Sequence, residues 1–406
     1  MIEGGPVIVT PRTAPPPGVV LRPIALGLAA LALTGLTLLL DGLPQGQDLL
    51  ALIHLGLVAG LLTLATAAAV QLSAATTGRS HPRPALLGLM TLLVPAGGIC
   101  LTAGFRLTLP PLLALGGLLA IGGLAAVFVR SLAAIVRSQA LRPLHLGLLV
   151  GLAGFLCAGV LGLVMAIGLT AHLPNLLAVL PWHLALAFGA GFGALLSGVS
   201  WQLLGMFGRG RQLGHRAAVT GTLLFAFAAP AAAWLWGIWG SAAAWLLAGA
   251  ALYHLALVTA SLLRSPSHRL PPFTGVAHLL AAASLVAAAV LLSSGLPSGA
   301  LGAAFGGIAV AVLGYLERIL PFLVFERHLA GRVEGRPVPK LTEILPPRGR
   351  GVLLALYLLS LALALLGWPL ALRSFGLALF AMSLRLLLAL RWLRPAFSQR
   401  GRNGQL

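Results

Sequence analysis

Charged residues are scarce in this chain of 406 residues, where they make up 8% of the sequence. A soluble domain carries about 25% charged residues, whereas here the hydrophobic fraction is 59% and the mean hydropathy is +1.02. The composition therefore excludes an ordinary soluble protein. Only 7 residues are acidic, which leaves a net charge of +19. Because the arginines lie in short connections between apolar runs, we interpret them as topology signals and expect no nucleic-acid partner.

Cysteine and the familiar catalytic motifs are also missing or rare. Cys100 and Cys157 both fall inside apolar runs. Their isolated positions, with no CxxC spacing, exclude a zinc site or a disulfide framework, and we expect both to be packing residues. No Walker, Rossmann, HExxH or nucleophile-elbow pattern occurs.

Long apolar runs dominate the chain, each near the length of about 20 residues that a membrane-spanning helix needs. They lie near residues 23–43, 48–72, 85–105, 111–136, 144–171, 177–207, 217–239, 241–263, 275–294, 299–325, 351–369 and 372–393. The runs predict an all-α fold, a polytopic membrane bundle of about 12 transmembrane helices embedded in the lipid bilayer. We expect a disordered cytoplasmic N-terminal segment at 1–22, a single transmembrane domain at 23–393 and a cytoplasmic basic tail at 394–406.

Basic residues between the runs predict how the bundle is oriented. If the N-terminus is cytoplasmic, the basic residues gather in every second loop, as the positive-inside rule requires. These loops hold Arg79, Arg83, Arg137, Arg142, Arg209, Arg211, Arg216, Arg264, Arg269, Arg327, Arg332, Arg336, Lys340, Arg348 and Arg350. An aromatic belt is expected at the outer ends, which contain Trp182, Trp234, Trp236, Trp239 and Trp368. Arginine strongly outnumbers lysine, which suggests a GC-rich bacterial genome. We expect a bacterial inner membrane protein with both termini in the cytoplasm.

Similar amino-acid sequences recur in the second, sixth and tenth runs. The second and sixth both have a histidine in the outer third and a Gln-Leu pair near the inner end, at Gln71 and Gln202. The tenth has the same small-residue body without a histidine, and Arg318 lies where the others have glutamine. The spacing predicts three pseudo-repeated four-helix units, and membrane proteins often place sites between repeats. The alternative is that spans rich in Ala, Leu and Gly resemble one another by chance.

Two histidines lie at a similar depth in these related runs, His54 in the second and His183 in the sixth. His54 is about six residues inside its span, roughly 10 Å from the outer boundary at the helical rise. Neutral imidazole is a good axial ligand for haem iron, so the pair could hold a haem. His172, in an outer loop, could reach the same layer. The alternative is that they are interfacial histidines bonded to backbone carbonyls or lipid headgroups.

The remaining histidines suggest other roles. His145, His254 and His278 lie toward the inner halves of their runs, at a different depth from His54, which favours a structural role. We expect the loop histidines to be solvated among the arginines, namely His81, His215, His268 and His328.

Ionisable residues inside spans are functional candidates because charge in hydrocarbon is costly. Glu317 and Arg318 are adjacent, and such neighbours do not face each other on a helix. One interpretation is that their side chains snorkel to the inner boundary. The other is a polar layer of Gln71, Gln202, Glu317 and Arg318 where the units meet, holding a propionate, an anion or water.

Twelve spans in three four-helix arcs, with histidines on the second and sixth helices, resemble the haem-copper oxidase subunit I superfamily. The segments ALIHLGLVAG, WHLALAFGAGFGALLSGVSWQLLGMF and GYLERILPFLVFERH look like its nitric-oxide-response (NnrS-like) branch, and the resemblance covers about 23 to 393. It implies that haem b is the cofactor and that His54 and His183 are metal ligands.

The chain departs from the family in its other metal ligands. The family pattern has paired histidines on the seventh helix for copper and two on the tenth for haems, but the runs 217–239 and 299–325 contain none. We therefore expect no binuclear oxygen-reducing centre and no copper, and we do not expect the isolated chain to be an enzyme.

Three functions stay open. The first is a haem-b-binding, oxidase-like membrane protein, an electron-transfer or accessory subunit of a respiratory or nitrogen-oxide-related complex. Its partners would be other membrane or cytochrome subunits. The second is a cofactor-free scaffold that retains the fold, and the third is a small-molecule or ion transporter, since Glu317 and Arg318 could line a path.

Overall fold

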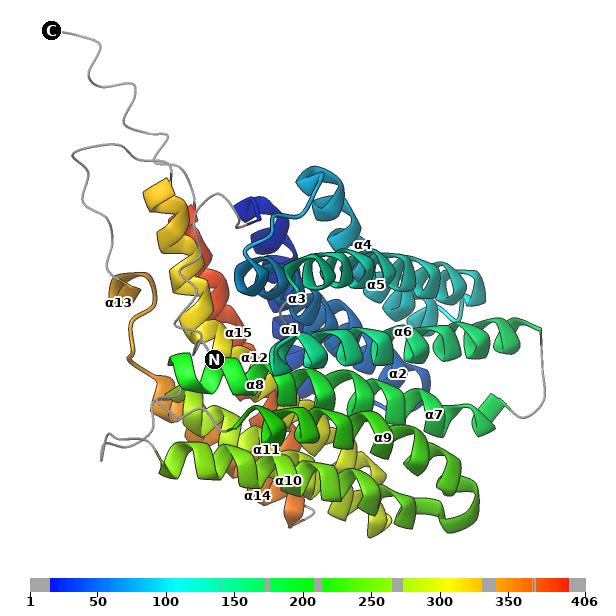
Figure 1. Ribbon diagram of the computed structural model, residues 1–406. Helices are drawn as coiled ribbons and strands as arrows, with labels where there is room; N and C mark the ends of the chain where they lie inside the picture. The colour runs from blue at the N-terminus through cyan, green and yellow to red at the C-terminus, as the bar shows by residue number, and fades with distance from the viewer. Residues whose placement is uncertain are drawn as a thin grey trace, which may run out of the picture.

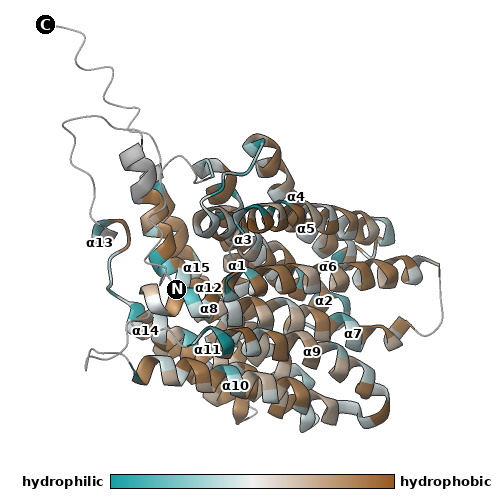
Figure 2. Ribbon diagram, in the orientation of Figure 1, coloured by the Kyte–Doolittle hydropathy of each residue, from teal (hydrophilic) through white to brown (hydrophobic). Residues whose placement is uncertain are grey.

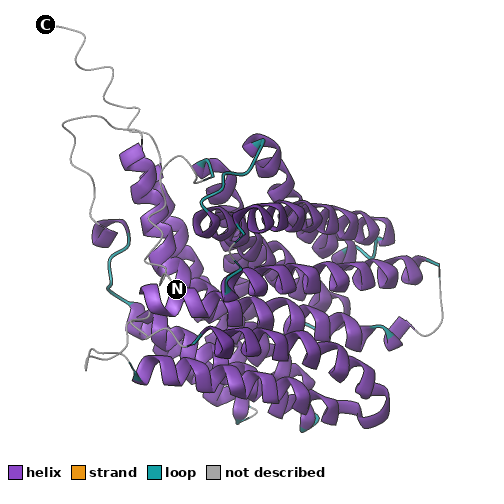
Figure 3. Cartoon of the chain, in the orientation of Figure 1, coloured by secondary structure: helices purple, strands orange, loops and turns teal. Residues whose placement is uncertain are grey.

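The computed structural model of the protein describes residues 15–139, 141–171, 176–207, 214–264, 273–330, 341–366, 368 and 370–393. Within these ranges nearly all residues are helical and none lies in a strand (Figure 3). The predicted all-α fold is confirmed.

The helices follow one another in three groups. The first unit contains α1 (Pro17–Asp41), then α2 (Gly46–His54), the π-helix η1 (Leu55–Leu62) and α3 (Thr63–Thr77) in one span, then α4 (Pro84–Arg106) and α5 (Pro110–Ser138). The second contains α6 (Pro143–Thr170), the short η2 (Leu176–Ala178), then α7 (Leu180–Ala185), the π-helix η3 (Leu186–Gly193) and α8 (Ala194–Phe207), followed by α9 (His215–Trp239), η4 (Gly240–Ala243) and α10 (Ala244–Leu263). The third contains α11 (Phe273–Ser293), α12 (Pro297–Ala330), the short α13 (Leu341–Ile344), α14 (Arg350–Leu365), α15 (Leu370–Ala389) and η5 (Leu390–Leu393).

The helices are long and apolar enough to cross a membrane. In the described chain, 10 stretches meet this criterion, and one of them, His215–Leu263, includes both α9 and α10. These two helices pack against each other after the chain turns at Gly240 (Figure 1). The apolar α14 is shorter, with 16 residues. With α9 and α10 counted separately and α14 added, the helices match the twelve predicted runs. Most of their residues are hydrophobic (Figure 2). The fold is that of a polytopic helical membrane protein.

The three units close into a ring. The last helix of each unit packs against the first helix of the next, α5 on α6, α10 on α11 and α15 on α1. In Figure 1 the blue and cyan helices of the first unit lie above the green helices of the second. Two glycines allow α1 and α15 to approach closely. A Cβ on Gly35 would lie 2.5 Å from the Phe380 backbone nitrogen, and one on Gly376 would lie 2.6 Å from that of Leu39. Small residues at such contacts are typical of membrane helix packing.

The second span of each unit is the most buried. Spans Gly46–Thr77, Leu180–Met206 and Pro297–Val324 are 67%, 72% and 67% buried, while every other candidate span is between 33% and 50% buried. Helix α12 contacts both η1 and α8. The predicted repeat therefore has a structural counterpart, because the three related spans occupy the same inner position in their units.

The N-terminal boundary differs from the prediction. The first helix begins at Pro17, inside the segment 1–22 that the sequence predicts to be disordered. A proline in the first turn leaves no intrahelical hydrogen bond unmade, since the first N–H groups have no partner in the helix, so the chain can be helical before Arg22.

The two ends of the bundle differ in charge and in aromatic content. One end, called here the arginine-rich end, carries Arg79, Arg137, Arg216, Arg264 and Arg348. The opposite end carries Asp41, Asp48, Trp239 and Trp368, and Asp48 forms an exposed ion pair with Arg106 at 2.9 Å.

Candidate functional site

Two of the three inner spans contain a π-helix directly after a histidine. His54 is the last residue of α2 and is followed by η1, while His183 lies near the end of α7 and is followed by η3. Each π-helix has 8 residues. Wide turns of this kind occur often at functional sites. The third inner span, Pro297–Val324 of α12, has neither a histidine nor a π-helix, and His328 lies beyond it near the end of the helix. The histidine and the irregular backbone therefore occur together.

Gln71 and Gln202 lie at the same distance from the π-helices of their spans. Gln71 lies as far beyond Leu55, the start of η1, as Gln202 lies beyond Leu186, the start of η3. Chance similarity between two apolar sequences does not explain why both spans contain a π-helix with a glutamine at the same distance from its first residue. The first two units are therefore structurally related in the spans that carry the candidate site.

His54 is half-buried, and its ring is held in place from two sides. Its Nδ1 lies 2.7 Å from the carbonyl oxygen of Leu50, one helical turn earlier. The Phe105 ring of α4 packs against it with a centroid separation of 4.8 Å. A carbonyl oxygen can only accept a hydrogen bond, so Nδ1 of His54 carries the proton and donates it.

His183 is held by the neighbouring helix of its own unit. Its Nδ1 donates to the carbonyl oxygen of Ala158 on α6 at 2.8 Å. Gly162, one turn further along α6, leaves room for the ring, because a Cβ there would lie 3.1 Å from Cε1 of His183. The same tautomer is therefore set in both histidines, once by a local carbonyl and once by a carbonyl from another helix.

The two rings present similar chemistry. With the proton on Nδ1, the Nε2 atom of a neutral imidazole carries a free lone pair. In the part of the chain that the structure describes, no hydrogen bond to Nε2 of His54 or His183 occurs. A histidine whose Nδ1–H is fixed by a carbonyl is in the form that ligates metals through Nε2.

Two imidazoles are donors of the kind and number that a haem iron can take from a protein. Among the described residues, no group of three or more His, Cys, Asp or Glu side chains could hold a metal ion. A haem iron takes only one or two axial ligands from the protein, because the porphyrin supplies the other nitrogens. His172, the third predicted ligand, lies outside the described residues.

Glu317 has partners that the sequence reasoning missed. Its carboxylate is only 2% exposed and accepts from Arg350 Nε at 2.7 Å and from Arg385 of α15 at 2.5 Å. The adjacent Arg318 is exposed, so the two side chains point apart as predicted. Glu317 does not snorkel, because both carboxylate oxygens are bound by these arginines. Arg385 lies in the middle part of the apolar run 372–393, away from Arg373 and Arg391 near its two ends. An arginine at such a position is itself a signal for a buried acidic partner.

The other members of the predicted polar layer have separate surroundings. Gln71 is half-buried on α3, and the Gln202 side chain donates to the Met206 sulfur at 3.3 Å. The observed contacts of Gln202 and Glu317 thus lie within α8 and within the third unit, respectively. A polar layer that joins these residues stays a prediction.

A second histidine pair lies where the second and third units meet. His254 of α10 and His278 of α11 are buried, with their Nε2 atoms 3.0 Å apart, and Ser200 of α8 lies 2.6 Å from His278 Nε2. The ring of Tyr315 packs on His278 at 5.3 Å. His278 Nδ1 is buried and has no hydrogen-bond partner among the described residues. Sequence reasoning placed these histidines in inner halves of their runs, but it did not predict that they meet.

Two further histidines have structural partners. His145 is buried at the start of α6, and its Nε2 lies 2.9 Å from the Thr76 hydroxyl of the first unit. His81 was expected to be solvated, and this prediction is wrong. Its side chain is 6% exposed and Nε2 donates to the Val70 carbonyl at 3.1 Å. The loop folds back over the end of α3, so the ring is covered despite its basic sequence neighbours.

Comparison with known proteins gives no identity. No protein-family model matches the chain, and no curated protein matches it. The resemblance to the haem-copper oxidase superfamily therefore stays a prediction.

Proposed function

We propose that this membrane protein binds a haem b through Nε2 of His54, with His183 as the second axial ligand. The observation that carries the proposal is the shared tautomer. Both rings donate Nδ1–H to a backbone carbonyl, Leu50 for one and Ala158 for the other, and both present an unprotonated Nε2. Two such rings, each close in sequence to a π-helix in related spans, are suited to ligating a haem iron.

A bound haem would supply a reversible one-electron couple, and the protein would set its potential through burial and axial ligation. The role that follows is electron transfer, as a subunit or accessory of a larger membrane complex with cytochrome or other membrane subunits as partners. The surroundings of His54 support this role, since the Phe105 ring and the apolar spans around the site would lower the local polarity.

The proposed setting is a bacterial inner membrane with the arginine-rich end in the cytoplasm. The positive-inside rule supports this orientation, because Arg79, Arg137, Arg216, Arg264 and Arg348 all lie at one end of the bundle. The candidate haem site would then lie in the outer half of the membrane.

Haem content per chain tests the proposal. Wild type, His54→Ala, His183→Ala and His215→Ala would be purified from haem-replete cells and compared by absorption spectrum and pyridine haemochrome. His215 is an exposed control at the start of α9. We expect a Soret band in wild type and the control, and its loss or a change in axial ligation in the other two variants. A wild type without haem, or variants with unchanged haem and spectrum, would refute the proposal.

A second candidate is passage of protons across the bundle, which the His254–His278 pair favours. Intramembrane histidines that bond to each other are typical of proton relays. Among the described residues Nδ1 of His278 has no hydrogen-bond partner, so this atom is available to exchange a proton. Proteoliposomes with a trapped pH-sensitive dye distinguish the two candidates. Proton flux that is present in wild type and lost in His278→Gln would support proton transport. A Soret band without proton flux would support haem binding and reject transport.

A further inference from the structure

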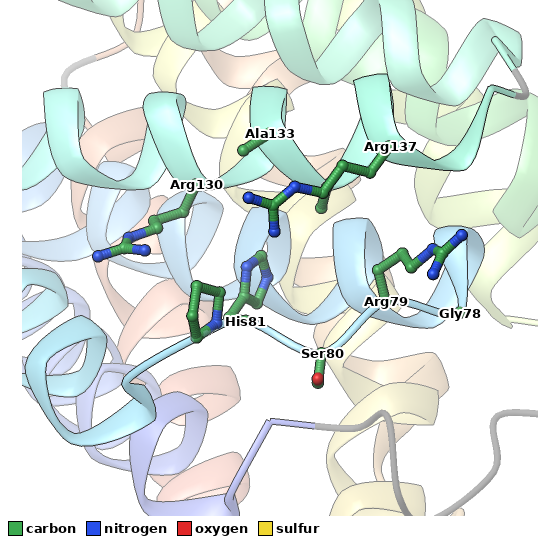
Figure 4. Close-up of a pocket in the computed structure, with 9 residues that line it drawn as sticks. Gly78, Arg79, Ser80, His81, Arg130, Ala133 and Arg137 are labelled. Atoms are coloured by element: carbon green, nitrogen blue, oxygen red, sulfur yellow. The ribbon is translucent and has the colours of Figure 1, made fainter.

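A basic cavity lies at the arginine-rich end, between the loop that joins α3 to α4 and the C-terminal part of α5 (Figure 4). Its volume is about 330 Å³. The loop contributes Arg79, Ser80 and His81, and α5 contributes Arg130 and Arg137. The two arginines of α5 are seven positions apart, two helical turns, so they lie on the same face of the helix.

No acidic residue among those described balances the charges of this cavity. None of its nine lining residues is acidic. In the part of the chain that the structure describes, neither Arg79, Arg130 nor Arg137 forms an ion pair. Arg79, Arg130 and Arg137 all line this cavity, and an anion bound there would reduce the mutual repulsion of their charges. The cavity therefore has the charge of an anion-binding site.

The walls of the cavity are held in place. His81 is buried beneath it, with Nε2 3.1 Å from the Val70 carbonyl and 3.2 Å from the Ser73 hydroxyl. Ser131 of α5 donates to the same Ser73 hydroxyl at 3.4 Å. These bonds connect the loop, α3 and α5, so the arginines are carried on a fixed frame. In Figure 4 the Arg137 side chain extends from α5 toward the His81 ring.

The chemistry of the cavity is suited to a phosphate group. Guanidinium donates in a planar fork that matches the oxygens of phosphate. Basic pockets between membrane helices near the charged interface bind the headgroups of anionic phospholipids. Arg130 is half-buried, while Arg79 and Arg137 are exposed, so the site is deep enough to hold a headgroup and open enough to admit one.

We propose that the cavity between Arg79, His81, Arg130 and Arg137 binds a phosphate group, either the headgroup of an anionic phospholipid or free phosphate. Without acidic lining residues the cavity also disfavours a zwitterionic headgroup, because the choline cation would meet the same three arginines. Binding would join α3, α4 and α5 at one end of the first unit.

Lipid binding to the full-length protein in a neutral detergent tests the proposal. Retained lipid would be measured by native mass spectrometry, and stabilisation by the Tm shift on adding phosphatidylglycerol, phosphatidylcholine or millimolar inorganic phosphate at constant ionic strength. The variants are Arg130→Gln and Arg137→Gln. The matched control is Arg264→Gln, an exposed arginine at the same end of the bundle and outside the cavity.

We expect phosphatidylglycerol to raise Tm more than phosphatidylcholine does, and its binding to weaken about tenfold or more in each cavity variant, as loss of a charge-assisted hydrogen bond implies. The control would bind like wild type. Stabilisation by inorganic phosphate that is lost in the same variants would support the site and identify free phosphate as sufficient. No stabilisation by any phosphate ligand, or equal binding by cavity variants and control, would overturn the proposal.

Discussion

Arg385 of α15 donates to Oε1 of Glu317 at 2.5 Å, and these two residues link helices that are separated by a long connection in the chain. Arg350, at the start of α14, binds the other carboxylate oxygen at 2.7 Å. One buried carboxylate thus joins three helices of the third unit. Its two arginines are largely buried as well, with side-chain exposures of 17% and 16%.

Replacing Glu317 should therefore destabilise the protein. In Glu317→Gln, Arg350 and Arg385 are left close together without their counter-charge, and removing one partner of a buried ion pair typically costs about 3 kcal/mol. Thermal unfolding in detergent would show a clear drop in Tm. Arg391→Gln, at an exposed arginine of η5, should change the free energy of unfolding by less than about 0.5 kcal/mol. Equal Tm values for the two variants would argue against the role of this ion pair.

Close packing of α4 on the π-helix η1 gives a second prediction. A Cβ on Gly98 would lie 2.4 Å from the backbone nitrogen of Ala59. Because that neighbour is backbone, Gly98→Ala should displace η1 and destabilise the protein by about 1–3 kcal/mol. Gly122→Ala on α5 has open space around its Cβ and should be neutral or stabilising, by up to about 1 kcal/mol from helix propensity. A wild-type Tm for Gly98→Ala would contradict the observed approach of the two helices.

His81 should make stability depend on pH. Burial lowers the pKa of its imidazole, and Arg130 lowers it further, against the raising effect of its bond to Val70. Arg79, Arg137 and the Ser73 hydroxyl also face this region. Below the ordinary histidine pKa of about 6.5, the unfolded chain binds a proton that the folded ring still excludes. This contribution to stability is therefore present above about pH 6.5 and is lost as the pH falls toward the folded pKa.

The comparison is with His81→Gln, whose amide can still donate to the Val70 carbonyl. Between about pH 7.5 and about pH 5.5, wild type should lose more Tm than the variant does. The measurement is the difference between the two Tm curves, which cancels contributions from the other titratable groups. Parallel curves would mean that His81 does not titrate differently in the folded and unfolded states.

Cysteine labelling tests the proposed orientation. In a Cys100→Ala and Cys157→Ala background, Arg348→Cys should resist a membrane-impermeant maleimide in intact cells, and Gln45→Cys should react. Both positions are exposed, at opposite ends of the bundle. Both should react after the membrane is permeabilised, which controls for accessibility. Labelling of Arg348→Cys in intact cells would contradict the proposed orientation and place the arginine-rich end outside.

Much of the architecture follows from local sequence. Each span is a run of apolar residues about as long as the membrane is thick, and a helix is the form in which one such segment satisfies its own backbone. The repeat could also be predicted from the sequence, because Gln71 and Gln202 occupy equivalent positions in two related spans. The similar depth of His54 and His183 also depends only on counting residues along a helix.

Tertiary structure decided the rest, because the deciding contacts join residues far apart in the chain. The tautomer of His183 depends on the Ala158 carbonyl of another helix, and Glu317 is bound by arginines of α14 and α15. His81 is buried because its loop folds back onto α3, although its sequence neighbours are those of a solvated loop. Composition and periodicity determine that a segment is helical and apolar. Which polar side chains then find a buried partner depends on the packing of helices, since an unpaired polar group inside the bundle carries a large free-energy cost.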